Sequence, residues 1–174
     1  MQTKNISKVN FLIYFFFTAY VLFMMYLLFF ARIHISGMAS VGVNLTPFYT
    51  IRSQLQHIWT TFAFVNLFAN TFALSPLGLY LPVIIKGRSF LFYTIIILII
   101  CVLIETIQWL FRLGAADIDD VILNFAGGVL GLIAFVICRK WIKDEVKVKV
   151  FILCISFIAG LLFTVAFLYY FGFI

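Results

Sequence analysis

The chain has 174 residues, of which 66% are hydrophobic and only 10% are charged, and 23 of them are Phe. A soluble domain of this size has too little interior for so much apolar surface, so the composition excludes a soluble globular protein and indicates one that crosses a membrane several times. The net charge is +6, but the basic residues lie beside the hydrophobic segments, where they indicate topology signals and lipid headgroup contacts and no nucleic-acid-binding face.

Five hydrophobic segments predict an all-α fold, a polytopic membrane helical bundle of about five transmembrane helices in a single domain over 1–174. We expect the spans at about 9–31, 60–85, 90–111, 121–139 and 149–172, each near the roughly 20 residues that cross a bilayer core. The first is longer than the roughly 7–15 apolar residues of a signal peptide, and no small-x-small site follows it, so we expect it to stay uncleaved. The second contains Pro76 and Pro82, which remove backbone donors and should bend or end it.

The longest connection, 32–59, should carry an external amphipathic helix. From Thr50 to Trp59 the apolar side chains share one helical face, and the polar ones lie mainly opposite. Thr46-Pro47 is a possible start for this helix. Two interpretations stay open, namely an interfacial helix on the outer membrane surface or a helix packed on top of the bundle.

The basic residues alternate from one connection to the next. The N-terminal segment and the second and fourth connections hold nine of the twelve Lys and Arg residues, which are Lys4, Lys8, Lys86, Arg88, Arg139, Lys140, Lys143, Lys147 and Lys149. The other side keeps Arg32, Arg52 and Arg112. Because short cytoplasmic loops carry an excess of Lys and Arg, we predict a cytoplasmic N-terminus and an external C-terminus.

Polar side chains recur at helical spacing beside three of the spans. A charged group at the centre of a membrane helix costs roughly 2.5–3.5 kcal/mol on insertion, so it is seldom without a role. In the predicted topology all of these groups lie in the outer-leaflet half, and we expect them to line one pocket that opens to the external side. The candidate ligand-binding residues are Asn66, Asn70, Glu105, Gln108, Arg112, Asp117, Asp120 and Asn124, and Gly127, Gly128 and Gly131 form a close-packing face.

Structural roles are the alternative for most of this set. Taken alone, the asparagines are better explained by hydrogen bonds between helices, worth about 0.6–2 kcal/mol each, than by a functional role. The start of a helix favours carboxylates, so at least one aspartate should be a cap, and on helical spacing Asp119 points away from the other two. Arg112 is a possible ion-pair partner of Glu105 or Asp117. Packing gives no reason for a carboxylate at Glu105, so we interpret it as functional or as half of a buried ion pair.

The chemistry of an enzyme is only partly present. Glu105 and Asp120 are the candidates for acid–base catalysis, because two carboxylates in different environments can have separated pKa values. No Ser or Cys is paired with a base, and no phosphate-binding glycine loop is seen. The histidines, His34 and His57, lie in the surface connection, so we expect no metal site and no cofactor. The spacings of Cys101, Cys138 and Cys154 indicate no disulfide framework.

Several short motifs follow one another between about 44 and 132. They are Asn44-Leu45-Thr46-Pro47-Phe48, Asn70 with Pro76-Leu77-Gly78, Glu105-Thr106-Ile107-Gln108, Gly114-Ala115-Ala116-Asp117-Ile118-Asp119-Asp120-Val121, and Asn124 with Gly127-Gly128-Val129-Leu130-Gly131. Taken in order, these motifs resemble the VanZ-like family of small bacterial membrane proteins, and the specific part is the ordered set of Glu, Gln, Asp, Asp, Asn and Gly. Ser75 and Phe125 depart from the family pattern beside this set, which affects substrate preference more than fold.

The resemblance implies a multi-pass protein of the bacterial plasma membrane with a role in tolerance of teicoplanin, a lipid-bearing glycopeptide antibiotic. We favour a non-enzymatic pocket that binds an amphiphile, either the lipoglycopeptide or a lipid-linked cell-wall precursor. The first alternative is a membrane enzyme that modifies such a lipid, with Glu105 or Asp120 as acid–base. The second is a lipid transporter, which would need a homo-oligomer. Membrane lipids are the other expected partners, and nucleic acid is not one.

Overall fold

Hydrophobic helices make up nearly all of the protein in a computed structural model, which describes residues 2–31 and 42–170. The helices are α1 (Gln2–Met25), the π-helix η1 (Tyr26–Ala31), α3 (Tyr49–Gln56), α4 (Thr61–Ala73), α5 (Ser75–Ile84), α6 (Phe90–Leu110), α7 (Ile118–Trp141) and α8 (Glu145–Tyr170). Two short strands, β1 (Val43–Asn44) and β2 (Ala116–Asp117), pair in parallel. The predicted all-α membrane bundle is thereby confirmed.

Four stretches are long and apolar enough to cross a membrane, and they match the first four predicted spans. They are Ser7–Phe29, Ala63–Ile84, Phe90–Leu110 and Ile118–Trp141. The helix α8 continues through most of the predicted fifth span, but 171–172 lie outside the described residues, so a count of five stays a prediction. Residues 32–41 of the longest connection, with Arg32 and His34, lie outside them as well.

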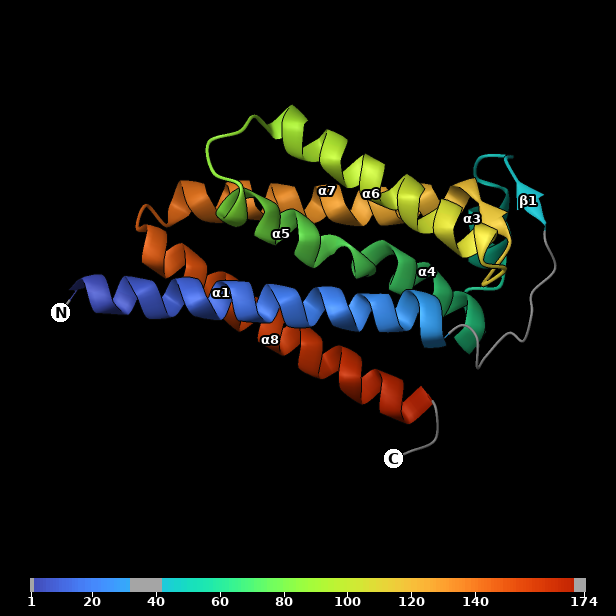
Figure 1. Cartoon of the computed structure of the whole chain (residues 1–174). Coiled ribbons are helices and arrows are strands. Elements are labelled where there is room, and N and C mark those ends of the chain that lie inside the picture. Colours follow the sequence, from blue (N-terminus) through green and yellow to red (C-terminus); the bar gives the residue numbers. More distant parts are fainter. Residues whose placement is uncertain (1, 32–41, 171–174) are drawn as a thin grey trace.

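The helix α7 holds the bundle together, because it packs against α4, α5 and α6, while α1 packs against α5 and α8. In Figure 1 the N-terminus, the α5–α6 loop and the α7–α8 turn lie at one end of the bundle, and α3 and β1 lie at the other. We call the first the basic end and the second the acidic end, after the charged residues described below.

The second span is bent, as its prolines predicted. The helix α4 ends at Ala73 and α5 begins at Ser75, because Pro76 has no backbone N–H for the next helical hydrogen bond. Other donors satisfy the carbonyls at the break. The Ser75 hydroxyl donates to Phe72 O at 2.9 Å, and the Tyr20 hydroxyl donates to Ala73 O at 2.8 Å. Pro82 lies within α5 without ending it.

Glycines bring α7 very close to this bent span. A Cβ added to Gly127 would lie 1.6 Å from Thr71 O, and one added to Gly131 would lie 1.9 Å from Ser75 O. Gly78 of α5 meets Gly128 O in the same way, at 2.0 Å from an added Cβ. Backbone therefore packs on backbone here, as small residues allow between membrane helices.

The predicted amphipathic helix exists but is shorter than expected, since α3 ends at Gln56. It contacts α4 and α7, which fits a helix packed on top of the bundle. None of its own residues is buried, and apolar side chains around it are exposed, among them Phe48, Leu55 and Trp59. Its position on the membrane surface stays a prediction.

Candidate functional site

The site is built around the start of α7, which begins where Asp117 caps it. Asp117 has extended backbone angles, and its Oδ1 accepts a hydrogen bond from Asp119 N at 2.9 Å. Such a side-chain acceptor satisfies one of the free amides in the first turn of a helix, and its negative charge complements the helix dipole. The expectation that at least one aspartate is a cap is confirmed.

Asp117 also joins the longest connection to α7. Its Oδ1 accepts from Asn44 Nδ2 at 3.3 Å, and its Oδ2 accepts from the Thr50 hydroxyl. The backbone supports the same contact, because Asn44 pairs with Asp117 in the parallel strands and Ala116 N donates to Gly42 O at 3.0 Å. Asp117 is therefore a structural junction of three segments.

Asp119 lies off the polar stripe, as its spacing predicted, but its carboxylate is fully buried with 0% exposure. It accepts hydrogen bonds from Phe48 N at 2.6 Å and from Ile51 N at 3.0 Å, the free amides at the start of α3. Phe48 has φ 64°, a left-handed conformation uncommon for a residue with a side chain. Asp119 thus fixes α3 to the helical bundle.

Glu105 and Gln108 join the end of α6 to two other elements. Glu105 is buried, and its Oε1 accepts from Asp117 N at 2.9 Å. Gln108, only 2% exposed, donates from Nε2 to Leu28 O in the π-helix η1 at 2.9 Å. The carboxylate and the amide, one turn apart on α6, therefore reach the start of α7 and the end of the first span.

Asp120 and Asn70 link α7 to the second span. The two side chains are buried, and Asn70 Nδ2 donates to Asp120 Oδ1 at 2.6 Å. At this separation the hydrogen bond is short for a nitrogen donor and an oxygen acceptor. This contact brings together two residues of the predicted ligand-binding set that are 50 positions apart.

Asn124 lies one turn further along α7 than Asp120, on the same face. It is only 4% exposed, and among the described residues its Oδ1 has no hydrogen-bond partner. A buried acceptor without a partner costs on the order of 1–3 kcal/mol. The position is therefore one where a bound polar group would add a missing hydrogen bond.

Two residues of the predicted set lie apart from this network. Asn66 is half-buried on α4, and among the described residues its side chain makes no hydrogen bond. Arg112 is exposed, has φ 57° and follows Phe111, the C-cap of α6. In the same turn Leu113 N donates to Gln108 O at 2.8 Å. In the described part of the chain Arg112 pairs with neither Glu105 nor Asp117, so that expected ion pair is not formed, because Arg112 occupies the left-handed turn that ends the helix.

Comparison with known proteins identifies the family of this chain. The VanZ/LLP1 family model matches residues 17–139, which is more than half of the chain. The chain belongs to the VanZ/LLP1 family. It is 34% identical over 104 residues to Protein VanZ of Enterococcus faecium, an alignment that covers 60% of this chain and 58% of that protein. No solved structure matches the chain.

The VanZ/LLP1 match is wider than the motifs indicated, since it begins inside α1 and ends near the end of α7. It therefore contains every residue of the site described above, including η1, whereas α8 lies beyond it. The family match and the four long apolar helices together identify a multi-pass membrane protein. Among the described residues, no group of three or more His, Cys, Asp or Glu side chains has a metal-binding arrangement.

Three residues of this VanZ/LLP1 chain take part in the network around the start of α7 but were not predicted as site residues from the sequence. They are Asn44, Thr50 and Asp119. Asn44 and Asp119 lie in the motifs that carry the resemblance, but their shared role depends on contacts between segments about 70 positions apart. The available signal was the pairing of an Asn-x-Thr-Pro turn with an Asp-x-Asp helix start, two patterns rich in capping groups.

Proposed function

We propose that this protein contributes to tolerance of teicoplanin-type lipoglycopeptide antibiotics by binding an amphiphile at the acidic end of its bundle. The ligand is either the antibiotic or a lipid-linked cell-wall precursor. It enters from the outer leaflet between the helices, and its sugar or cationic groups meet the buried carboxylates and amides. The phenotype follows because fewer drug molecules reach their target.

The observation that carries the proposal is Asn124 Oδ1, which is buried and has no hydrogen-bond partner among the described residues. Asp120 lies one turn before it on α7 and accepts a hydrogen bond from Asn70 of α4. Buried acceptors are nearly always paired, so this position, next to two other buried polar groups, favours a ligand. A hydroxyl or ammonium group of a ligand would add the missing hydrogen bond.

The network also suits recognition of an amphiphile in another respect. The helices α4 and α6, which carry part of the network, also carry exposed apolar side chains, including Phe64, Phe68 and Trp109. An acyl chain can lie against such a surface while the polar part enters the network, which is how small-molecule sites commonly combine apolar lining with a few placed polar groups.

The test is the teicoplanin concentration that inhibits a susceptible bacterium expressing the protein. Asp120→Asn and Asn124→Ala should return tolerance to the level without the protein, because each removes a group that holds the ligand. Asp144→Asn is the matched control, since this carboxylate is exposed, lies at the basic end and should leave tolerance unchanged. Immunoblots of the membrane fraction must show equal amounts of each variant. Full tolerance in both site variants would refute the proposal.

Glu105→Gln separates binding from catalysis. The amide keeps an acceptor for Asp117 N but cannot take up a proton. Two properties of the Glu105→Gln variant are compared with those of the parent protein, namely teicoplanin tolerance in cells and stabilisation of the purified protein by teicoplanin. If the protein acts by binding, the variant should keep both properties or lose both. Teicoplanin without its acyl chain should stabilise less. If Glu105→Gln abolishes tolerance while teicoplanin still binds, the result would favour a membrane enzyme in which Glu105 is the acid–base group.

A further inference from the structure

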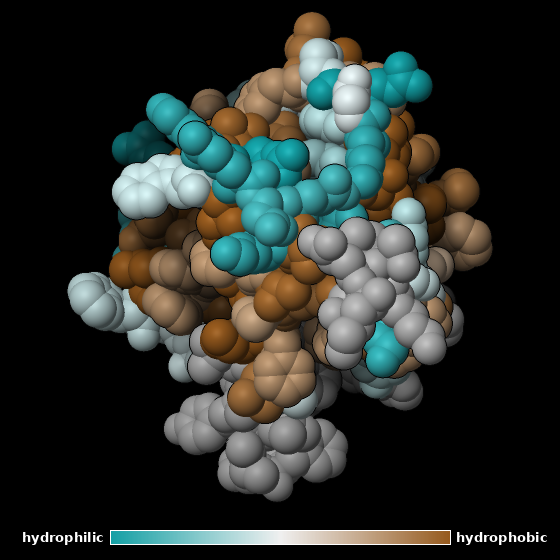
Figure 2. Space-filling view, turned by 90° about the vertical axis from the view of Figure 1, so that its left-hand side faces the viewer, coloured by the Kyte–Doolittle hydropathy of each residue, from teal (hydrophilic) through white to brown (hydrophobic). Residues whose placement is uncertain are grey.

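A cavity of about 320 Å³ lies at the basic end of the bundle, far from the site just described. It is enclosed by the end of α5, the α5–α6 loop, the start of α6, the end of α7 and the start of α8. Its floor is apolar, with Val83, Leu132 and Phe135 among the lining residues. Figure 2 shows this end of the molecule, where hydrophilic side chains gather on one part of the surface above a largely apolar one.

Four cations line this cavity, and among its lining residues only one carboxylate opposes them. The cations are Lys86, Arg88, Arg139 and Lys149, and the carboxylate is Glu145. Asp144, the neighbouring acid, instead accepts hydrogen bonds from Val146 N at 2.8 Å and Lys147 N at 3.0 Å at the start of α8. The cavity therefore carries a net positive charge.

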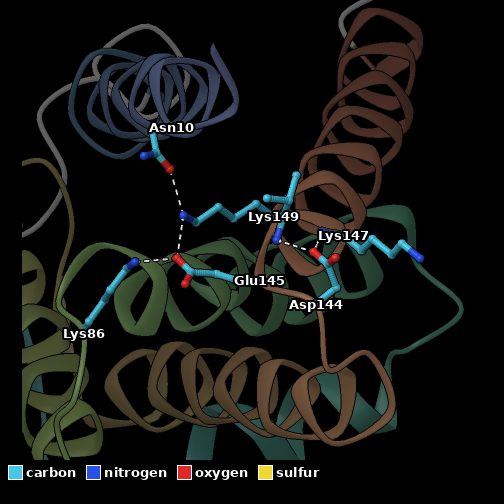
Figure 3. A network of polar contacts seen from close by, with 7 residues as sticks. Asn10, Lys86, Asp144, Glu145, Lys147 and Lys149 are labelled. Carbon is cyan, nitrogen blue, oxygen red and sulfur yellow. Dashed lines mark hydrogen bonds and ion pairs between the residues drawn. The ribbon is translucent and has the colours of Figure 1, made fainter. Parts of the chain in front are cut away.

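The lysines share the one carboxylate, as Figure 3 shows. Lys149 Nζ lies 2.7 Å from Glu145 Oε1 and 2.7 Å from Asn10 Oδ1 of α1, and Lys86 Nζ bonds to the same Glu145 oxygen. Hydrogen bonds from Lys149 and Lys86 lower the pKa of Glu145 to about 2, so it is ionised at neutral pH. This ion pair orders the lysines on one side of the cavity.

The arginines, in contrast, have no carboxylate partner among the described residues. Arg139 is exposed on the last turn of α7. Arg88 lies over the Phe92 ring at 5.5 Å from its centroid. Its loop is held by Tyr93, whose hydroxyl donates to Ile85 O at 2.5 Å and accepts from Arg88 N at 3.2 Å. A guanidinium forms paired hydrogen bonds with phosphate oxygens, and an ordered loop lowers the entropy cost of binding.

We propose that this cavity binds the phosphate headgroup of an anionic phospholipid. Its volume lies at the small end of ligand sites, roughly 300–1,000 Å³, which suits a headgroup and not a whole lipid. The acyl chains have a place outside it, because Leu91 and Ile95 on α6 and Val136 on α7 are exposed apolar side chains. Basic pockets between membrane helices bind anionic headgroups by this combination of charge and apolar surface. The proposal does not depend on the proposed function.

The test is native mass spectrometry of the purified full chain in neutral detergent with added phosphatidylglycerol or phosphatidylethanolamine of the same acyl chains. The wild-type protein should retain phosphatidylglycerol at least fivefold better. Arg88→Gln/Arg139→Gln should lose this preference. Lys140→Gln/Lys143→Gln is the matched control, since both lysines are exposed at the same end but do not line the cavity. Arg139→Gln alone, at an exposed position, serves if the double variant does not fold.

Each outcome decides the proposal. Loss of preference in the arginine variants alone, unaffected by 10-fold molar excess of inorganic phosphate over lipid, supports a phospholipid site in this cavity. Equal loss in the lysine control would show a diffuse surface effect and overturn it. Retention in all variants would overturn it too. Displacement of the lipid by inorganic phosphate would assign the cavity to a soluble anion instead.

Discussion

Asp119 is the residue that lets a phenylalanine occupy a backbone conformation usual for glycine. Phe48 has φ 64°, which costs of order 1–3 kcal/mol for a residue with a side chain. The buried Asp119 carboxylate accepts from Phe48 N at 2.6 Å and Ile51 N at 3.0 Å. Hydrogen bonds to an ionised group are worth about 1.5–3 kcal/mol each, enough to hold this turn. The same bonds make the buried carboxylate tolerable.

Asp119→Ala should therefore lower the free energy of unfolding by on the order of 2–4 kcal/mol, as two amides lose a charged acceptor in a buried place. Asp144→Ala is the control, because Asp144 also accepts from two amides at a helix start but is exposed. It should cost about 1 kcal/mol. Helicity measured during SDS titration of the purified variants gives both values. Equal losses would contradict the role given to burial.

The sequence predicted which residues are polar and share a helical face, but not which of them hold the structure. Asp119 was placed off the stripe correctly, since that depends only on the 3.6-residue period. Its contact with Phe48 spans 71 positions and depends on the path of the longest connection. The expected pair between Arg112 and Glu105 or Asp117, which is not formed among the described residues, fails for a local reason, because Arg112 lies in the left-handed turn after α6. Local spacing is readable from sequence, and long-range partners are not.

Among the elements, α7 and the bent second span form the tightest pair. Glycines face the Thr71 and Ser75 carbonyls so closely that the helices touch through their backbones. The bend itself follows from Pro76, and the small residues of α7 are visible in its sequence. Which carbonyl meets which glycine depends on the bend angle, and this could not be predicted from spacing.

Gly127→Ala should separate these two helices. Its Cβ would lie 1.6 Å from Thr71 O, which is a backbone atom and cannot move away as a side chain would. Overpacking of this kind costs about 1–3 kcal/mol or more. Gly160→Ala on α8 is the control, because nothing lies within 4 Å of an added Cβ there, and the change should be neutral or slightly stabilising. Thermal unfolding in detergent compares the two, and similar midpoints would contradict the tight contact.

For the whole molecule, the two ends differ in charge. Lys and Arg gather at the basic end, and the buried Glu105, Asp119 and Asp120 lie at the acidic end. Alternation of basic connections predicts that the basic end faces the cytoplasm. The positions of the first four spans agree with the hydrophobic pattern, because each span is one long segment whose apolar residues are consecutive in the sequence. The orientation in the membrane requires a direct measurement.

Cysteine labelling provides that measurement. A membrane-impermeant maleimide added to intact cells should react with Ser53→Cys, an exposed position on α3. Lys143→Cys, in the α7–α8 turn, should react only after the cells are permeabilised. Cys101 and Cys138 are buried, and the exposed Cys154 is replaced by Ser in both variants. Reaction of Lys143→Cys in intact cells would reverse the predicted orientation.

The contact between α7 and the second span also constrains how the protein is made. The stretch Ala63–Ile84 has the lowest hydropathy of the four membrane-crossing candidates, 1.5, and half of it is buried in the finished bundle. At roughly 5–20 residues per second, the ribosome completes α7 several seconds after this stretch. During that interval the Thr71 and Ser75 carbonyls have no α7 glycines to pack on, and Asn70 lacks Asp120. We therefore expect the second span to stay with the insertion machinery until the fourth span is made.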